Sequence, residues 1–142
     1  MDDQTLDRID QLSEEGNIHC DEGNYQEAIR VWTEALDLVP SPQNVHAESL
    51  WLEASIGDAF FLLDDFGNAL SHFEKAKQNI IENAYENPFI MLRLGQCYLE
   101  DNNSELAQEY LLRAYMMMEG RDIFEDESPK YLTFIGNNID LD

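Results

Sequence analysis

Residues 16–35 read GNIHCDEGNYQEAIRVWTEA, and their spacing of small and large residues decides the fold because it occurs twice more. Gly16 stands twelve positions before an alanine, a large apolar residue follows four positions later, and a second alanine comes three positions after that. The same spacing begins at Gly57 and at Gly95. A repeated unit of this kind cannot bury its apolar face alone, so it must stack against its neighbours.

Apolar residues at helical spacing predict that the chain is helical almost throughout, and no alternating pattern predicts a strand. Asn24 with Glu27 is typical of a capped helix start, and Ser104 is the expected cap of the helix that begins there. Asn87-Pro88 and Ser128-Pro129 each combine a capping residue with a proline at the first helical position. The expected helices cover residues 6–21, 25–38, 41–63, 68–85, 88–100, 104–119 and 130–135.

The repeated residues resemble the tetratricopeptide repeat, whose signature is W-x2-L-G-x2-Y followed by A-x3-F, A and P. The three copies supply Leu12, Gly16, His19, Ala28, Trp32, Ala35 and Pro40, then Ile56, Gly57, Phe60, Ala69, Phe73 and Ala76, then Leu94, Gly95, Tyr98, Ala107, Leu111 and Ala114. The first copy departs from the signature at Glu15 and His19, and the later copies lack the closing proline.

This resemblance implies an all-α fold, a short right-handed α-solenoid of three helix pairs with a C-terminal capping helix. It implies a single domain over residues 1–142, with repeats at about 9–42, 43–86 and 87–120, a cap at about 128–136 and a loose tail at 137–142.

The repeat glycines are 41 and 38 positions apart, whereas the family period is about 34 residues. The excess is close to two helical turns and one turn, at about 3.6 residues per turn. We therefore expect longer helices at 41–63 and 68–85, with ordinary loop insertions as the alternative.

Charge limits the classes of partner. The 142 residues carry 30 Asp and Glu against 8 Lys and Arg, a net charge of −22. Such a field repels nucleic acids and anionic membranes and attracts basic proteins, although solubility alone also explains it. The two unpaired cysteines, the lack of an apolar leader and the lack of a membrane-length apolar run indicate a reduced, cytoplasmic setting.

No motif indicates chemistry. His19 and Cys20 are adjacent, and adjacent helical residues point in different directions, so they do not make a nucleophile and its base. The cysteines and histidines lack metal-ligand spacing. We therefore expect no enzyme activity, no catalytic residue, no metal and no cofactor.

In the family, the first helix of each pair lines a concave groove. Carried over by position, the resemblance implies a partner-binding surface that is apolar in the middle and acidic at its edges. Its residues are Asp10, Asn17, Asp21, Trp51, Asp58, Phe61, Leu62, Phe89, Gln96 and Glu100. The aromatic members are either anchors for a partner or simply packed beneath neighbouring helices.

These positions include no Lys or Arg, so a basic or amphipathic protein segment fits them better than a C-terminal carboxylate does. The leading hypothesis is an immunity or antitoxin-like inhibitor of a basic toxin, by analogy with small acidic repeat proteins of bacterial type. The alternatives are a secretion chaperone that binds an amphipathic segment of an exported protein, and a self-associating scaffold that forms a homodimer.

Overall fold

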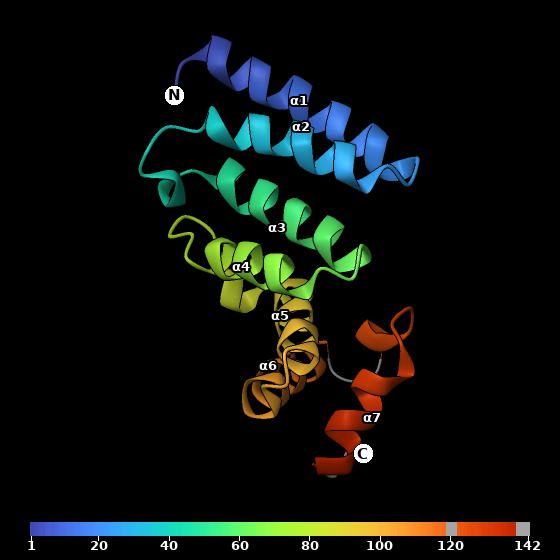
Figure 1. Ribbon diagram of the computed structural model, residues 1–142. Helices are drawn as coiled ribbons and strands as arrows, with labels where there is room; N and C mark the ends of the chain where they lie inside the picture. Colours follow the sequence, from blue (N-terminus) through green and yellow to red (C-terminus); the bar gives the residue numbers. More distant parts are fainter. Residues whose placement is uncertain (119–121, 139–142) are drawn as a thin grey trace. The chain divides into compact units, whose positions relative to one another are not determined.

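The helices of the computed structural model follow one another as antiparallel pairs joined by short turns (Figure 1). The structure describes residues 1–118 and 122–138. Seven α-helices and three short 3-10 helices account for the secondary structure in those ranges, so the all-α expectation and the repeat architecture are confirmed there. Two compact units divide the chain, Met1–Asn83 and Ala84–Asp142. The single domain expected over 1–142 and its repeat boundaries stay predictions.

The N-terminal unit holds two helix pairs, α1 (Asp3–Asp21) with α2 (Tyr25–Asp37) and α3 (Ala47–Leu62) with α4 (Phe66–Lys77). In Figure 1 these helices lie in chain order as successive layers, and α2 packs against both α1 and α3. The core is formed by apolar side chains of α1, α2 and α3 and of Val39, which follows α2. The other members are Ile9, Leu12, Ala28, Val31, Trp32, Ala35, Leu36, Leu52, Ile56 and Ala59.

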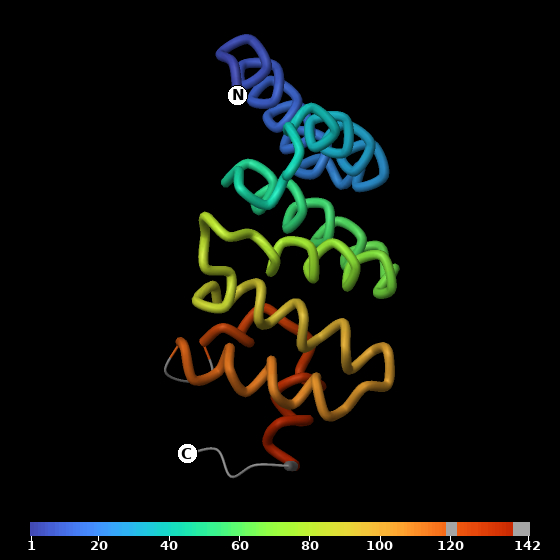
Figure 2. Tube along the Cα trace, turned by 90° about the vertical axis from the view of Figure 1, so that its left-hand side faces the viewer, coloured from blue at the N-terminus to red at the C-terminus, as the bar shows by residue number. Residues whose placement is uncertain are grey.

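The C-terminal unit holds the pair α5 (Pro88–Glu100) and α6 (Ser104–Met117), followed by η3 (Asp122–Phe124) and α7 (Pro129–Asn138). Figure 2 shows the red η3 and α7 lying against the pair of gold α5 and orange α6, in agreement with contacts of η3 to α5 and α6 and of α7 to α6. The predicted capping helix is therefore present. It runs on through residues 137–138, and the remainder of the expected tail lies outside the described residues.

The repeat glycines let the two helices of each pair approach closely. A Cβ on Gly16 would lie 2.2 Å from Nε1 of Trp32, and one on Gly95 would lie 2.6 Å from Cγ of Leu111. The corresponding distance at Gly57 is 3.0 Å, to the ring of Phe73. Real Cβ atoms essentially never approach closer than 3.0 Å, so a side chain at Gly16 or Gly95 would clash and one at Gly57 would be tight. The lack of a side chain at these positions therefore permits the close helix packing that the repeat spacing predicts.

The three turns within pairs share one backbone device. Gly23, Asp64 and Asn102 each stand seven positions after a repeat glycine and each has a positive φ, of 78°, 60° and 62°. The next residue's N–H then donates to the carbonyl five positions back, as in Asn103 N to Tyr98 O at 2.8 Å. This is the hydrogen bond of a helix that ends in a left-handed residue.

The prediction that α3 and α4 are lengthened by whole turns is wrong. The extra residues form loops, because side chains there bond to the backbone and compete with helix formation. Gln43 Nε2 donates to Leu36 O and Val39 O at 2.8 and 3.1 Å, which ends α2 and holds the 3-10 turn η1 (Gln43–Val45). Buried Asn79 donates to His46 O at 2.8 Å and accepts from Ile81 N, so the loop after α4 is tied to the loop before α3.

Two predicted caps also differ. Asn24 makes no side-chain cap bond, and Glu27 instead accepts from Arg30 Nε at 2.9 Å, so the expected capping box is absent from α2. At α6 the cap is Asn103, whose Oδ1 accepts from Leu106 N at 3.2 Å, and not Ser104. Asn87 caps α5 as expected and accepts from Ile90 N at 3.2 Å.

Candidate functional site

The N-terminal unit has a hollow of about 410 Å³ between α1 and α3, which we call the α1/α3 hollow. Three residues expected to bind a partner, Asp10, Asn17 and Trp51, come together in its wall. The full lining is Ile9, Asp10, Ser13, Asn17, Trp32, Ala47, Glu48, Trp51, Leu52 and Ser55.

The walls are built from the repeat pattern. Asp10, Ser13 and Asn17 are spaced by three and four residues, so they share one side of α1. Trp32 lines the hollow from α2 and is only 4% exposed. It packs where Gly16 lacks a side chain, and its Nε1 donates to Ser13 O at 3.1 Å. Trp51 lines it from α3 with 53% of its surface exposed, which leaves a large aromatic face in contact with water.

The charge of the hollow is negative. Asp10 and Glu48 carry carboxylates into its lining, and the ten lining residues include no Lys or Arg. Arg8 lies two residues from Asp10 and so points from another side of α1.

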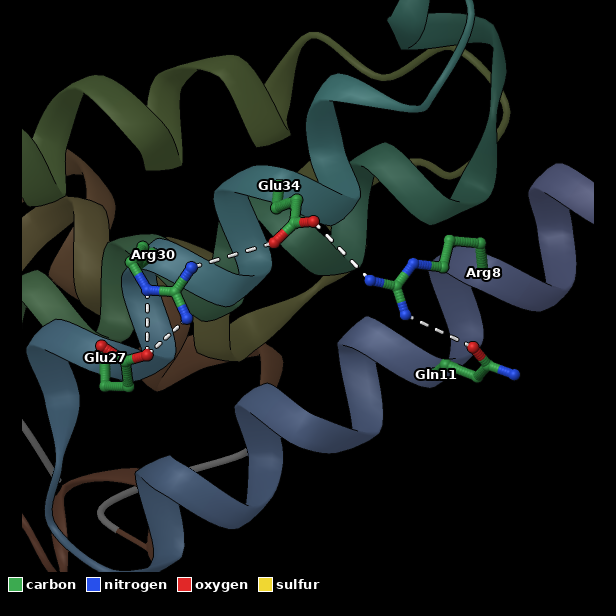
Figure 3. Close-up of polar contacts among 5 residues, drawn as sticks. All are labelled: Arg8, Gln11, Glu27, Arg30 and Glu34. Atoms are coloured by element: carbon green, nitrogen blue, oxygen red, sulfur yellow. Dashed lines mark hydrogen bonds and ion pairs between the residues drawn. The ribbon is translucent and has the colours of Figure 1, made fainter.

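Figure 3 shows the polar contacts of the two arginines in the pair of α1 and α2. Arg8 of α1 and Arg30 of α2 both reach Glu34, at 3.7 and 3.9 Å, and Arg8 also donates to Gln11. These pairs are exposed, so each contributes little stability. These ion pairs hold the guanidinium groups of Arg8 and Arg30 beside Glu34, and none of the three residues lines the α1/α3 hollow. The two arginines therefore do not neutralise the carboxylates in the lining.

The other expected residues of the N-terminal unit lie elsewhere on α1 and α3. Asp21 and Asp58 act on Cys20, whose thiol pKa is raised by burial first and by these two carboxylates second. A raised pKa keeps the thiol protonated at neutral pH, which is the unreactive form. Phe61 packs edge-on against Phe66 at 5.4 Å between ring centroids, and Leu62 is 45% exposed.

In the C-terminal unit the expected residues belong to a different environment. Gln96 is completely buried, and its Nε2 donates to Glu127 Oε1 at 2.7 Å. Glu100 accepts from the Tyr131 hydroxyl at 2.9 Å, and the Arg93 guanidinium lies 5.0 Å over the ring of Phe89. The expectation that Gln96 lies on an accessible surface is therefore wrong, because residues 122–138 cover it. The binding roles of all ten residues stay predictions.

Sequence reasoning missed Glu48, Ser55 and Arg93. Glu48 and Ser55 lie one turn before and one turn after Trp51, a spacing that could have found them. Arg93 gave no local signal, since its partner Glu127 is 34 positions away.

Within residues 1–118 and 122–138, no cluster of His, Cys, Asp or Glu side chains is arranged to hold a metal ion. None of the helices described there is both long enough and apolar enough to cross a bilayer.

Comparison with known proteins agrees with the repeat. Two profiles of the tetratricopeptide repeat match, one at residues 10–42 and one at residues 90–117. No curated protein matches the sequence.

Solved structures share the fold at low sequence identity. The Yersinia enterocolitica type III secretion chaperone SycD, in complex with a peptide of the translocator YopD, is 14% identical with a TM-score of 0.69 and coverage of 92% of each chain. PcrH from Pseudomonas aeruginosa is 13% identical with a TM-score of 0.67, covering 96% of this chain and 93% of its own. The Arabidopsis OM64 TPR domain is 16% identical with a TM-score of 0.71, covering 95% and 99%.

Proposed function

This chain is a tetratricopeptide repeat protein, and from that premise we propose that it binds a basic, partly apolar segment of another protein in the α1/α3 hollow. The observation that carries the proposal is the exposed Trp51, which lines the same hollow as the acidic residues Asp10 and Glu48. An aromatic face gives a partner's apolar side chain area to bury, and the flanking carboxylates favour Lys or Arg beside it.

The size of the hollow favours a segment over a folded surface. A volume of about 410 Å³ accommodates a few side chains. Asn17, Ser13 and Ser55 add amide and hydroxyl groups that can bond to a partner's backbone. A helical segment would present its side chains to such a site, and an extended segment would present its side chains and its backbone.

Within this class we propose a chaperone-like role, in which the protein holds a segment of an incompletely folded partner. The likeness to SycD and PcrH, and the YopD peptide bound to SycD, support this role. The immunity or antitoxin interpretation has no counterpart among these relatives. The self-associating scaffold stays an alternative prediction.

The test uses short synthetic peptides as probes. A peptide of alternating lysine and leucine is titrated into the full chain, beside matched peptides with glutamate or serine in place of lysine. Binding is followed by the change in tryptophan emission, which we expect to come mainly from the exposed Trp51 because Trp32 is buried and its surroundings change less. We expect the lysine peptide to bind about tenfold more tightly than the glutamate peptide, because carboxylates line the hollow.

The matched variants are Trp51→Ala and Leu38→Ala. Their affinity is measured with a labelled lysine–leucine peptide, because Trp51→Ala removes the exposed intrinsic fluorophore. Both side chains are exposed and apolar, but Leu38 does not line the hollow. Trp51→Ala should weaken the lysine peptide by about tenfold or more, and Leu38→Ala should leave it unchanged. Equal affinity for the lysine and glutamate peptides, or equal effects of the two variants, would refute the proposal.

A second experiment separates a chaperone from an inhibitor. A photo-crosslinking amino acid at position 51 captures the natural partner in cells, and the captured protein is then offered in folded and in unfolded form. A chaperone-like role predicts tighter binding of the unfolded form and higher solubility of the complex. Preference for the folded form, with loss of its activity, would contradict the chaperone role and support an inhibitor.

A further inference from the structure

A second hollow, of about 200 Å³, lies in the N-terminal unit between the first half of α3 and the end of α4, and we call it the α3/α4 pocket. Its lining is polar and includes two charged side chains; it consists of Gln43, Asn44, Ser49, Glu53, Lys75 and Gln78. None of these residues lines the α1/α3 hollow. Glu53 comes two positions after Trp51, so the two hollows lie on opposite sides of α3.

Glu53 stands at a core position of the repeat. The tetratricopeptide signature has a tryptophan four positions before the repeat glycine. The first and third copies have Leu12 and Met91 at this position, and the second has Glu53. All three side chains are buried. A carboxylate therefore lines a hollow at the position where the other two copies pack an apolar side chain.

One oxygen of the Glu53 carboxylate is held and the other has no protein partner. Oε2 accepts from His72 Nδ1 at 2.7 Å, and the His72 ring stacks on Phe60 with 5.5 Å between centroids. Among residues 1–118 and 122–138, nothing donates a hydrogen bond to Oε1. The Glu53 side chain is only 7% exposed, so bulk water solvates it poorly. A ligand that supplies a donor to this oxygen satisfies a buried polar group.

The loops that exceed the repeat period build the pocket wall. Gln43 and Asn44 belong to the connection between α2 and α3, and Gln78 directly follows α4. Asn44 Nδ2 donates to Gln78 O at 3.4 Å, and Asn44 O accepts from Ile80 N at 2.8 Å. These bonds join the two loops, so the wall is in place before a ligand arrives, which lowers the entropic cost of binding.

The second charge in the lining is the ammonium of Lys75. Lys75 lies on α4 and is exposed, and no carboxylate of the described residues pairs with it. A ligand with a positive charge alone would be attracted by Glu53 and repelled by Lys75. A ligand with an ammonium and a carboxylate finds an opposite charge for each of them.

We propose that the α3/α4 pocket binds a small polar α-amino acid in its free zwitterionic form, with the ammonium donating to Glu53 and the carboxylate paired with Lys75. The hollow has the volume of about six water molecules, which suits a molecule of that size. The side-chain amides in the lining offer hydrogen-bond donors and acceptors to the ligand's own polar side chain. This site is separate from the peptide site in the α1/α3 hollow and does not depend on it.

The probes are free L-serine, L-asparagine and L-glutamine, each titrated at millimolar concentration into the full chain. Calorimetry measures binding, and a rise in melting temperature accompanies it because the ligand binds only the folded state. We expect at least one of the three to bind. The analogues that lack one charge, which for serine are ethanolamine and 3-hydroxypropionate, should bind at least about tenfold more weakly because each loses a charged contact.

Matched variants assign the two contacts. Glu53→Gln keeps the shape of the side chain and removes its charge, and Lys75→Gln changes an exposed residue; Lys77→Gln, on the same helix but outside the lining, is the control. Glu53→Gln and Lys75→Gln should each weaken the amino acid by about tenfold or more, and Lys77→Gln should leave its affinity unchanged. Circular dichroism verifies that each variant keeps its helices.

Lys75→Gln also provides a readout that a loss of folding would not give. In this variant the amino acid should lose its advantage over the analogue that lacks the carboxylate, because the partner of that carboxylate is gone. The proposal would be overturned if none of the three amino acids bound. It would also be overturned if wild type bound the amino acid and the ammonium-only analogue equally, or if Lys75→Gln and Lys77→Gln had the same effect.

Discussion

The α1/α3 hollow and the side of α5 that carries Arg93, Gln96 and Glu100, which we call the α5 face, share two positions of the repeat, yet one region is open and the other is covered. Asn17 and Gln96 each directly follow a repeat glycine; Asn17 is exposed and Gln96 is 0% exposed. The hollow is lined by acidic residues, whereas the α5 face presents Arg93 to an acidic segment. The repeat therefore determines which positions lie on the outer side of each helix. Whether those positions are exposed to solvent depends on other segments of the same chain that pack over them.

The largest predicted difference concerns two glutamates. Glu127→Ala removes the carboxylate paired with the buried Arg93 and should lower the free energy of unfolding by about 3 kcal/mol. Glu48→Ala, at the open hollow, should change it by no more than about 0.5 kcal/mol. Urea unfolding followed by circular dichroism measures both. Equal effects would erase the distinction between a covered and an open carboxylate.

The second prediction tests whether both regions depend on the same joint between paired helices. Gly16→Ala and Gly95→Ala place a Cβ against Trp32 and Leu111, and each should cost about 1–3 kcal/mol. Gly67→Ala, which meets nothing within 4 Å, is the control and should not destabilise the protein. Thermal denaturation reports all three. A neutral Gly16→Ala or Gly95→Ala would refute the close approach at that joint.

Salt should separate the two regions by a smaller margin. Raising salt from low to high concentration should weaken the lysine–leucine peptide at the hollow by about tenfold, mainly through a slower association rate. The same change should affect the stability contributed by the Glu127 and Arg93 pair less, because that pair is buried and poorly screened. Stopped-flow measurements give the association rate of the peptide, and urea unfolding of wild type and Glu127→Ala gives the contribution of the pair. An equal proportional loss of both with salt would contradict the prediction.

The smallest effect is a pH dependence of the hydrogen bond between Tyr131 and Glu100. Burial and the hydrogen bond to Glu100 raise the pKa of Tyr131 above its usual value of about 10. The folded protein therefore binds this proton more tightly, so the stabilisation is complete below about pH 10 and is lost as the pH rises above it. The advantage of wild type over Tyr131→Phe should shrink by about 1 kcal/mol between pH 8 and pH 11. An advantage that is constant with pH in urea titrations would exclude this coupling.

Local signals in the sequence were sufficient for the repeat and most of its helices. The glycine and alanine positions follow from close packing within a pair, and that requirement is visible in residue size alone. Trp51 was found because the repeat places it on an outward position of α3. The lengths of α3 and α4 were predicted wrongly because two side chains hydrogen-bond to distant backbone groups. Gln43 donates to Leu36 O, and Asn79 donates to His46 O, which lies 33 positions earlier in the sequence.

The covered α5 face could not be predicted from local pattern. Gln96 and Glu100 look like the polar surface of a helix, and Glu127 looks like one more acidic residue in an acidic chain. These residues come into contact only because residues 122–138 pack back against α5, and such a tertiary contact joins residues about thirty positions apart in the sequence. Spacing within a helix carries no information about that contact.

Hydrogen exchange of the full chain, with and without the lysine–leucine peptide, tests the central claim most directly. The claim is that the acidic α1/α3 hollow is open to a basic segment while the α5 face is held by residues 122–138. The account predicts new protection in α1 and α3 and none in α5 or α7. Protection confined to α5 and α7, with α1 and α3 unchanged, would contradict it.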